Sequence, residues 1–159
     1  MKITLRKDLG QDIDFYYHQQ FRIYHDPYLI WDRDTWKVTI NTCDVYRIEV
    51  NEKWVGDIIL EDRKKSTKYI VDFSILPEYQ GKGIGRGVLE QVKKMGKDLI
   101  GITRRETLEF FLKSGFVLKK TIRNYYQAGV DGYYITFSGK TVTMLSHENP
   151  EGGELELKN

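Results

Sequence analysis

The sequence predicts one mixed α+β domain, and its length, composition and periodicity are the observations behind that prediction. Its 159 residues are enough to bury a core, and 40% hydrophobic with 30% charged residues is typical of a folded globular protein. Segments with the two-residue period of strands are interspersed with segments of helical period. No repeat or linker divides the chain, so we expect the domain to cover residues 1–140, followed by an extension over 141–159.

In the first half of the chain, helical spacing of apolar and aromatic residues predicts a helix over residues 11–24. Asp26-Pro27 ends this helix, because proline disfavours a helical conformation in the residue before it. Residues 31–41 are ambiguous, and a second short helix is one interpretation. The strands expected here are residues 2–7, 45–51, 53–62 and 68–76, with a turn at Asn51-Glu52 between the second and third.

In the second half, apolar residues at helical spacing after a glycine-rich segment predict a helix that ends at Gly96. Thr103 followed by Glu106 fits a capping box, so another helix is expected to begin there and to end at Gly115. The strands expected in this half are residues 98–103, 116–122 and 132–138.

Composition excludes several classes of protein and site. A net charge of +2 does not indicate a nucleic-acid partner, and no apolar run approaches the ~18 residues that cross a membrane. One cysteine, Cys43, excludes an internal disulfide, and His18 and His25 lack the further ligands that a metal site needs. The N-terminus lacks the apolar core of a signal peptide. We therefore expect a cytoplasmic protein without metal, nucleic-acid or membrane partner, while its oligomeric state stays open.

The segment PEYQGKGIGRG, residues 77–87, has glycine at every second position from 81 to 87, with Lys82 and Arg86 between them. Glycine lets a backbone approach a ligand closely, and the free N–H groups at the start of a helix bind anions. Because a strand enters this segment and a helix leaves it, the segment predicts a cradle for a pyrophosphate. A glycine-rich turn without a ligand is the alternative.

Spacing indicates which kind of cradle this is. A Walker loop fails, because Val88 follows Gly87 where a lysine is needed. The dinucleotide fingerprint also fails, because Arg86 and Val88 stand where it requires glycine. The pattern that fits is Gln-x-x-Gly-x-Gly, formed by Gln80, Gly83 and Gly85, and it is weak on its own.

Residues 70–92, IVDFSILPEYQGKGIGRGVLEQV, resemble the acetyl-CoA-binding strand, loop and helix of the GNAT superfamily of N-acetyltransferases. Residues 107–116, TLEFFLKSGF, resemble its next helix, and the order of elements agrees over roughly residues 2–138. Residues 121–134 resemble the Tyr-Tyr loop of the ribosomal-protein N-terminal acetyltransferase branch. The resemblance implies the GNAT fold, a central mixed and mostly antiparallel sheet flanked by helices.

The resemblance also implies where acetyl-CoA binds. Backbone groups of residues 73–75 would contact the pantetheine arm and stabilise the oxyanion, and the N–H groups of residues 81–86 would hold the pyrophosphate. The cofactor-binding residues that it implies are Phe73, Ser74, Ile75, Gln80, Gly81, Lys82, Gly83, Ile84, Gly85, Arg86, Arg104 and Phe111.

Three positions depart from the pattern of the N-terminal acetyltransferase branch. Its base glutamate falls on Leu99, its cofactor-binding asparagine on Arg104 and its acid tyrosine on Phe111. Losing a general acid typically costs ~10²–10⁴ in rate. Neutralising a lysine at pH 7 costs about 4.6 kcal/mol, against about 1 kcal/mol for an α-amine. Without a strong base, a peptide N-terminus is therefore the favoured acceptor.

Substitute catalytic groups are available on the strand before the loop and further along the chain. Asp72 is a candidate base acting through water, and a solvated or ion-paired carboxylate is its alternative. Tyr126 is a candidate proton donor in the Tyr-Tyr loop, with a packing role as its alternative. Further candidates are Tyr125, Asp57 and Glu61. Arg104 and Arg105 stand in the first turn of a helix, where the dipole disfavours cations, so a phosphate of coenzyme A or simple solvation would explain them.

The predicted function is transfer of acetyl from acetyl-CoA to a primary amine, either of a small molecule or at a peptide N-terminus. One alternative is an acyl-CoA-binding sensor or interaction module that has lost catalysis, which the three departures motivate. Another is an acetyltransferase for a polyamine or an aminoglycoside. A deep acidic acceptor pocket would favour the small molecule, and a shallow groove would favour the peptide.

Overall fold

The computed structural model describes residues 1–9 and 12–140. Its strands form a seven-stranded sheet in the order β1-β2-β3-β4-β5-β7-β6. β4 pairs with β5 in parallel, whereas the pairs β1–β2, β2–β3, β5–β7 and β7–β6 are antiparallel. Four helices accompany this sheet in the described residues, so the predicted α+β class is confirmed. Two compact units make up the chain: residues 1–61 with 70–84, and residues 62–69 with 85–159. The predicted boundary at residue 140 stays a prediction, and the extension lies outside the described residues.

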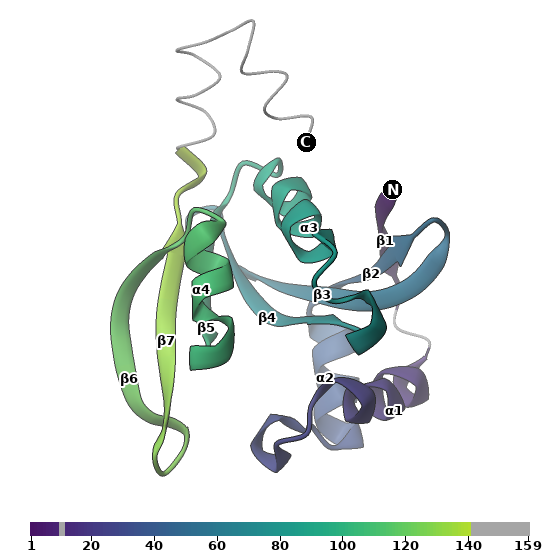
Figure 1. Ribbon diagram of the computed structural model, residues 1–159, viewed down its shortest axis with the longest axis horizontal. Helices are drawn as coiled ribbons and strands as arrows, with labels where there is room; N and C mark the ends of the chain where they lie inside the picture. Colours follow the sequence, from purple (N-terminus) through teal and green to yellow (C-terminus); the bar gives the residue numbers. More distant parts are fainter. Residues whose placement is uncertain (10–11, 141–159) are drawn as a thin grey trace, which may run out of the picture. The chain divides into compact units, whose positions relative to one another are not determined.

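The first unit combines two helices with the N-terminal strands (Figure 1). Each helix begins at an aspartate: Asp12 accepts a hydrogen bond from the N–H of Phe15 at 3.1 Å, and Asp32 accepts one from Thr35 at 2.7 Å. Such caps satisfy N–H groups that a helix leaves unpaired. The elements of this unit are β1 (Ile3–Asp8), α1 (Ile13–Ile23), η1 (Pro27–Leu29), α2 (Arg33–Thr42), β2 (Asp44–Val50), most of β3 (Lys53–Arg63), the end of β4 (Thr67–Ile75) and η2 (Pro77–Tyr79).

The core of the first unit is aromatic. The rings of Tyr16 and Trp36 stack with centroids 5.6 Å apart, and Ile59 of β3 belongs to the same buried cluster. Arg47 donates to the carboxylate of Asp8 at 2.9 Å and lies 3.9 Å from the ring centroid of Trp54. The ion pair and the cation–π contact hold the Arg47 guanidinium against Asp8 and Trp54.

Close approach of β3 to β4 depends on Gly56. A Cβ atom at this position would lie 2.1 Å from the carbonyl oxygen of Ser74, so no other residue fits without a shift of the backbone. The N–H of Leu76 donates to the carbonyl of Val55 at 2.8 Å just beyond. The end of β4 is therefore held against β3 where the glycine-rich loop begins.

The second unit contains the start of β4, two helices and the C-terminal strands. β5 pairs in parallel with β4, from Thr67 opposite Asp98 to Tyr69 opposite Ile100. Lys93 is buried and donates to the carbonyl of Ser114 at the end of α4, which satisfies an otherwise unpaired helix carbonyl. Its elements are α3 (Ile84–Lys93, all but its first residue), β5 (Asp98–Thr103), α4 (Arg105–Lys113), β6 (Val117–Gln127) and β7 (Val130–Phe137).

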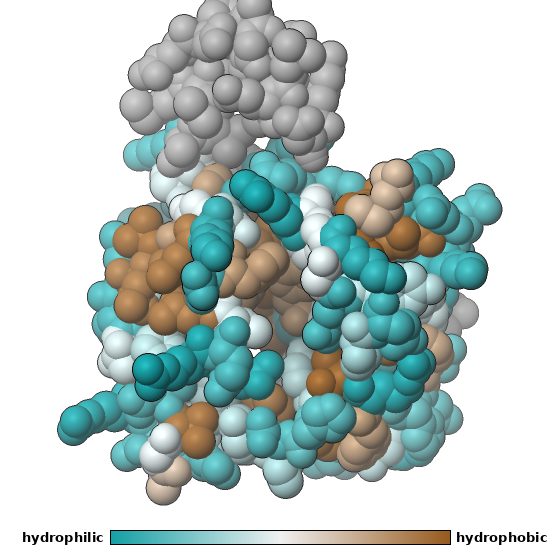
Figure 2. Space-filling view, in the orientation of Figure 1, coloured by the Kyte–Doolittle hydropathy of each residue, from teal (hydrophilic) through white to brown (hydrophobic). Residues whose placement is uncertain are grey.

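The surface of the second unit carries an apolar patch. Figure 2 shows hydrophobic side chains gathered over α4 and β6 among hydrophilic neighbours. Exposed apolar residues of these elements are Leu112, Val117 and Leu118. No helix of the described part of the chain is long and apolar enough to cross a membrane.

Two local predictions are wrong. The N-cap of α4 is Arg104, not Thr103, because Thr103 is the last residue of β5 and pairs with Tyr133 of β7. Tyr125 and Tyr126 lie in β6 rather than in a loop, because the hairpin turns only at Gly129, where φ is +80°. The register of β6 against β7 shifts between Ile122 and Gln127, the segment that contains both tyrosines, and Asn124 within it has a positive φ.

Candidate active site

The glycine-rich loop is held in place by its glutamine. Gln80 donates its side-chain N–H to the carbonyl of Ile75 at 2.8 Å, so the amide ties the loop to the last residue of β4. The N–H of Gln80 also caps η2 through the carbonyl of Pro77 at 3.2 Å. The side-chain hydrogen bond to Ile75 explains why the Gln-x-x-Gly-x-Gly pattern begins with glutamine.

The glycines of the loop are required by backbone conformation. Gly81 and Gly83 have φ of +74° and +82°, which L side chains rarely adopt, and no atom lies within 4 Å of where their Cβ atoms would stand. α3 then begins at Ile84, whose side chain is 1% exposed and anchors the helix start.

The charge of the loop agrees with an anionic ligand. The first N–H groups of α3 have no partners within the helix and carry its positive dipole end. Lys82 lies in the loop with its ammonium 5.7 Å from the ring centroid of Tyr79, and Arg86 is exposed in the first turn of α3. The residues present therefore fit a pyrophosphate group.

The end of β4 joins this loop to a buried polar group. Ser74 is buried, and its hydroxyl donates to the carboxylate of Asp57 on β3 at 3.1 Å. Phe73 and Ile75, on either side of it, are partly exposed. The side chain of Ser74 therefore points into the interior of the unit.

Asp72 stands beside Asp57 within the first unit. Tyr24, just after α1, donates its hydroxyl to the Oδ1 atom of Asp72 at 2.9 Å. Asp57 is 2% exposed, and burial together with the neighbouring Asp72 carboxylate raises its pKa well above the ordinary value. Sequence reasoning named both aspartates separately but missed Tyr24, because its partner lies 48 residues away in the chain.

Tyr125, Tyr126 and Arg104 lie in the second unit, and Glu61 lies in the first. The hydroxyl of Tyr126 donates to the carbonyl of Ile102 at 3.3 Å, and its ring meets that of Tyr125 edge to face at 5.0 Å. Arg104 faces Glu106 at 3.8 Å, so a carboxylate of its own helix supplies one counter-charge for this cation.

Two of the three positions that depart from the family pattern are filled by buried apolar side chains. Leu99 is 0% exposed, and Phe111 is 7% exposed with its ring 5.3 Å from that of Phe116. Neither side chain can exchange a proton. The described residues contain no group of three histidine, cysteine or acidic residues that could hold a metal.

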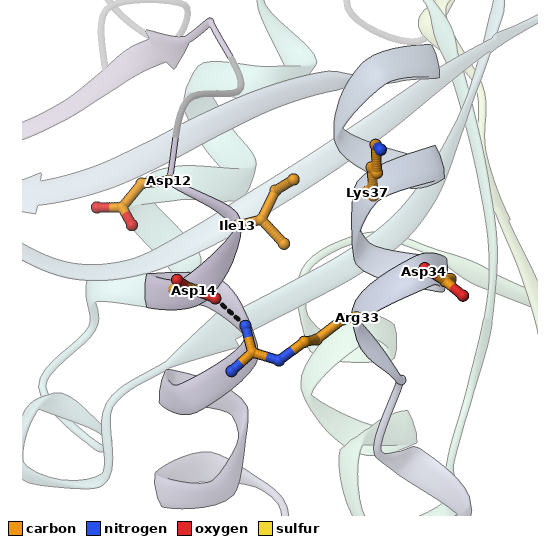
Figure 3. Close-up of a pocket in the computed structure, with 6 residues that line it drawn as sticks. All are labelled: Asp12, Ile13, Asp14, Arg33, Asp34 and Lys37. Atoms are coloured by element: carbon orange, nitrogen blue, oxygen red, sulfur yellow. Dashed lines mark hydrogen bonds and ion pairs between the residues drawn. The ribbon is translucent and has the colours of Figure 1, made fainter.

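A hollow of about 340 Å³ lies elsewhere in the first unit, at the N-terminal ends of α1 and α2 (Figure 3). Arg33 reaches from α2 to form an ion pair with Asp14 of α1 across it. Its lining residues are Asp12, Ile13, Asp14, Arg33, Asp34 and Lys37. None of the predicted site residues lines this hollow.

A protein-family model matches the middle of the chain. The family model described as an acetyltransferase (GNAT) domain matches residues 41–118, which include the end of β4, the glycine-rich loop and both helices that follow. No curated protein matches the sequence.

Solved structures of the same fold include acetyltransferases of three kinds. The ribosomal-protein-S18-alanine N-acetyltransferase from Escherichia coli is 20% identical, with a TM-score of 0.72 over 86% of this chain and 93% of that chain. Arabidopsis thaliana Naa50, in complex with the bisubstrate analogue CoA-Ac-MVNAL, is 21% identical, with a TM-score of 0.70 over 87% and 99%. A spermidine N-acetyltransferase chimera from Vibrio cholerae and hSSAT is 16% identical, with a TM-score of 0.72 over 89% and 98%.

The predicted fold is thus confirmed by strand order, by the family match and by these structures. The similarity that the sequence indicated to the ribosomal-protein branch is confirmed as well, at the level of the fold. Residues 41–118 match the GNAT acetyltransferase family, and the chain has the fold of solved GNAT acetyltransferases.

Proposed function

We propose that this protein is an acetyl-CoA-dependent N-acetyltransferase that acetylates a primary amine, with a peptide N-terminus as its acceptor. The observation that carries the proposal is the loop from Gln80 to Gly85, which enters α3 with two glycines in the left-handed region. In a GNAT protein, a loop so placed suits the pyrophosphate of coenzyme A. The complex of Naa50 with a CoA-linked peptide analogue supports acetyl-CoA as the donor and a peptide as the acceptor.

The chain's own residues would hold the co-substrate in two ways. Backbone N–H groups of Gly81 to Arg86 would bind the pyrophosphate, with Lys82 adding charge. Backbone groups of Phe73 to Ile75 would orient the pantetheine arm. Arg104 and Phe111 are the other residues that we propose to bind acetyl-CoA. Acetyl-CoA itself supplies an activated acetyl group.

Two side chains are proposed to handle protons. Asp72 would take the proton of the acceptor ammonium, and its half-buried carboxylate already accepts a hydrogen bond from Tyr24. Tyr126 would donate to the departing thiol. Its present bond to the carbonyl of Ile102, at 3.3 Å, is long for a hydroxyl donor, so a better acceptor could replace it.

The acceptor class follows from the cost of removing a proton. An α-ammonium costs about 1 kcal/mol to neutralise at pH 7, and a lysine side chain costs about 4.6 kcal/mol. Because Leu99 stands at the position of the family base, this chain should acetylate an α-amine more readily than a lysine side chain. A polyamine is the second candidate, favoured by the buried carboxylates of Asp57 and Asp72 and by the similarity to a spermidine N-acetyltransferase.

Release of free thiol from acetyl-CoA tests the proposal. The acceptors are a peptide with a free N-terminus, the same peptide N-blocked but carrying lysine, and spermidine. We expect the free N-terminus to react fastest. Faster reaction of spermidine would select the second candidate, and binding of acetyl-CoA without thiol release from any amine would indicate a module that has lost catalysis. The cytoplasmic location expected from the sequence stays a prediction.

A further inference from the structure

Two carboxyl groups meet in the interior of the first unit, one from β3 and one from β4. Asp72 lies two residues before Ser74 on β4, so its side chain is on the same side of the strand as the Ser74 hydroxyl that contacts Asp57, and burial together with the Asp72 carboxylate raises the pKa of Asp57. Each has one oxygen with a neutral donor: Ser74 donates to Oδ2 of Asp57 at 3.1 Å, and Tyr24 donates to Oδ1 of Asp72 at 2.9 Å. The two hydroxyls therefore fix the orientation of both carboxyl groups.

The other oxygen of each carboxyl group is buried and has no donor. These atoms are Oδ1 of Asp57 and Oδ2 of Asp72, and neither exposes as much as 1 Å². Buried polar atoms are nearly always hydrogen-bonded, and two like charges at this separation cannot both persist without cost. One proton shared by the two carboxyl groups would give both oxygens a partner.

The surroundings supply no positive charge in place of that proton. Arg47 stands directly opposite Asp57 in the pairing of β2 with β3, yet its guanidinium bonds to Asp8 and lies over Trp54. Tyr16, the other titratable group near Asp57, donates its hydroxyl to Asp8 as well. Among the described residues, neither Asp57 nor Asp72 has an ion pair.

We propose that Asp57 is the positioning residue behind Asp72, so that the proton taken from the acceptor ammonium passes through Asp72 and is held by Asp57. The inference rests on the proposed function and adds to it a residue that makes the base effective. An isolated aspartate of pKa about 3.9 is a poor match for an α-ammonium near 7.8. Proton transfer is most efficient when the two pKa values are close, and burial moves the pKa of Asp57 in that direction.

The proton count of the step is complete. The step begins after the pair has lost its shared proton, and the ammonium gives one proton to the carboxylate pair and becomes a neutral amine. The nitrogen lone pair forms the N–C bond to the acetyl carbon as the C–S bond breaks, and the second nitrogen proton goes to the departing sulfur. The pair then releases its proton to water, so each turnover yields an amide, free coenzyme A and one proton.

Infrared spectroscopy detects the shared proton without acetyl-CoA or amine. Near pH 6 we expect the protein to show the band of one protonated carboxyl group in its interior. Asp57→Asn and Asp72→Asn should each abolish this band, while Asp26→Asn, at an exposed position, should leave it. Ser74→Ala should move its loss to higher pH, because the serine hydroxyl lowers the pKa of Asp57. A wild-type spectrum without the band would overturn the proposal.

The pH profile of kcat/KM separates the catalytic role from a structural one. We expect Asp57→Asn to shift the acidic limb of the profile and to lower kcat/KM near pH 7 about tenfold or more, with KM for acetyl-CoA unchanged. An identical profile in wild type and Asp57→Asn would contradict the role of Asp57 while leaving the proposed function intact. A retained infrared band without turnover of any amine would overturn the proposed function instead, and the catalytic role of the pair with it.

Discussion

The interiors of the two units bury different kinds of side chain. In the first unit, the facing sides of β3 and β4 enclose two carboxyl groups and a hydroxyl, from Asp57, Asp72 and Ser74. In the second unit, Leu99 and Phe111 fill the two positions where the family resemblance implied a base and an acid. The difference teaches that the first unit buries titratable carboxyl groups, whereas the two positions that the family pattern marks for a base and an acid hold apolar side chains.

Of the variants that test this difference between the units, Asp72→Asn should have the largest effect, which is a loss of kcat/KM. Removing a general base typically costs ~10²–10⁴ in rate, and the asparagine cannot accept the ammonium proton. Steady-state assays of thiol release would measure kcat/KM, with the exposed Asp26→Asn as the matched control. Loss of less than about threefold would show that the first unit does not supply the base.

Phe111→Ala should reduce the free energy of unfolding by ~3–5 kcal/mol, because it leaves a cavity among packed aromatic rings. Leu112→Ala is the control on the same helix, and it should cost much less because Leu112 is 41% exposed. Urea denaturation followed by circular dichroism would measure both. Equal losses for the two variants would mean that Phe111 does not pack as described.

Asp57 should make stability fall as pH rises. Its pKa is raised in the folded state, so its full contribution is present below the unfolded pKa of about 3.9 and is lost as pH rises through the folded value. A folded pKa that exceeds the unfolded pKa by one contributes about 1.4 kcal/mol to the free energy of unfolding at low pH. Thermal unfolding from pH 4 to pH 8 should therefore show a declining Tm in the wild type and a flatter curve in Asp57→Asn. Parallel curves would contradict the raised pKa.

Tyr126→Phe should have the smallest effect. A thiol of pKa about 8.5 departs readily as the thiolate, so loss of this donor should lower kcat by about tenfold at most. Tyr125→Phe, at a 45% exposed neighbour, is the control and should leave kcat unchanged. A loss of kcat as large as that of Asp72→Asn would contradict the account, because it would mean that a residue of the second unit is as important for proton transfer as Asp72.

Local signals in the sequence predicted most of the fold. Periodicity placed the strands and helices, and the turn at Asn51-Glu52 has the positive φ values that such a turn needs. The resemblance supplied the sheet and the loop. The cap at Thr103 failed because pairing with β7 keeps that residue in a strand, and no local pattern reveals a pairing partner 30 residues away.

The carboxyl pair could not be predicted from the sequence either, because no local pattern shows which residues of two strands lie next to each other. Alternation along β4 left the direction of Asp72 open, and its meeting with Asp57 depends on how β3 lies against β4. Gly56 was the available signal, since a glycine within a strand often marks close approach of another backbone. Tyr24 had no such signal, because only the path of the chain after α1 brings its hydroxyl to Asp72.

The most direct test of the account is a calorimetric titration with acetyl-CoA of the wild type and two glycine variants. Gly83→Ala and Gly129→Ala introduce the same backbone strain, at φ of +82° and +80° with open space at both sites, but only Gly83 lies in the proposed cradle. We predict micromolar binding by the wild type, unchanged binding by Gly129→Ala and binding weakened about tenfold or more by Gly83→Ala. Absence of binding by the folded wild type, or equal weakening by both variants, would contradict the assignment of the loop.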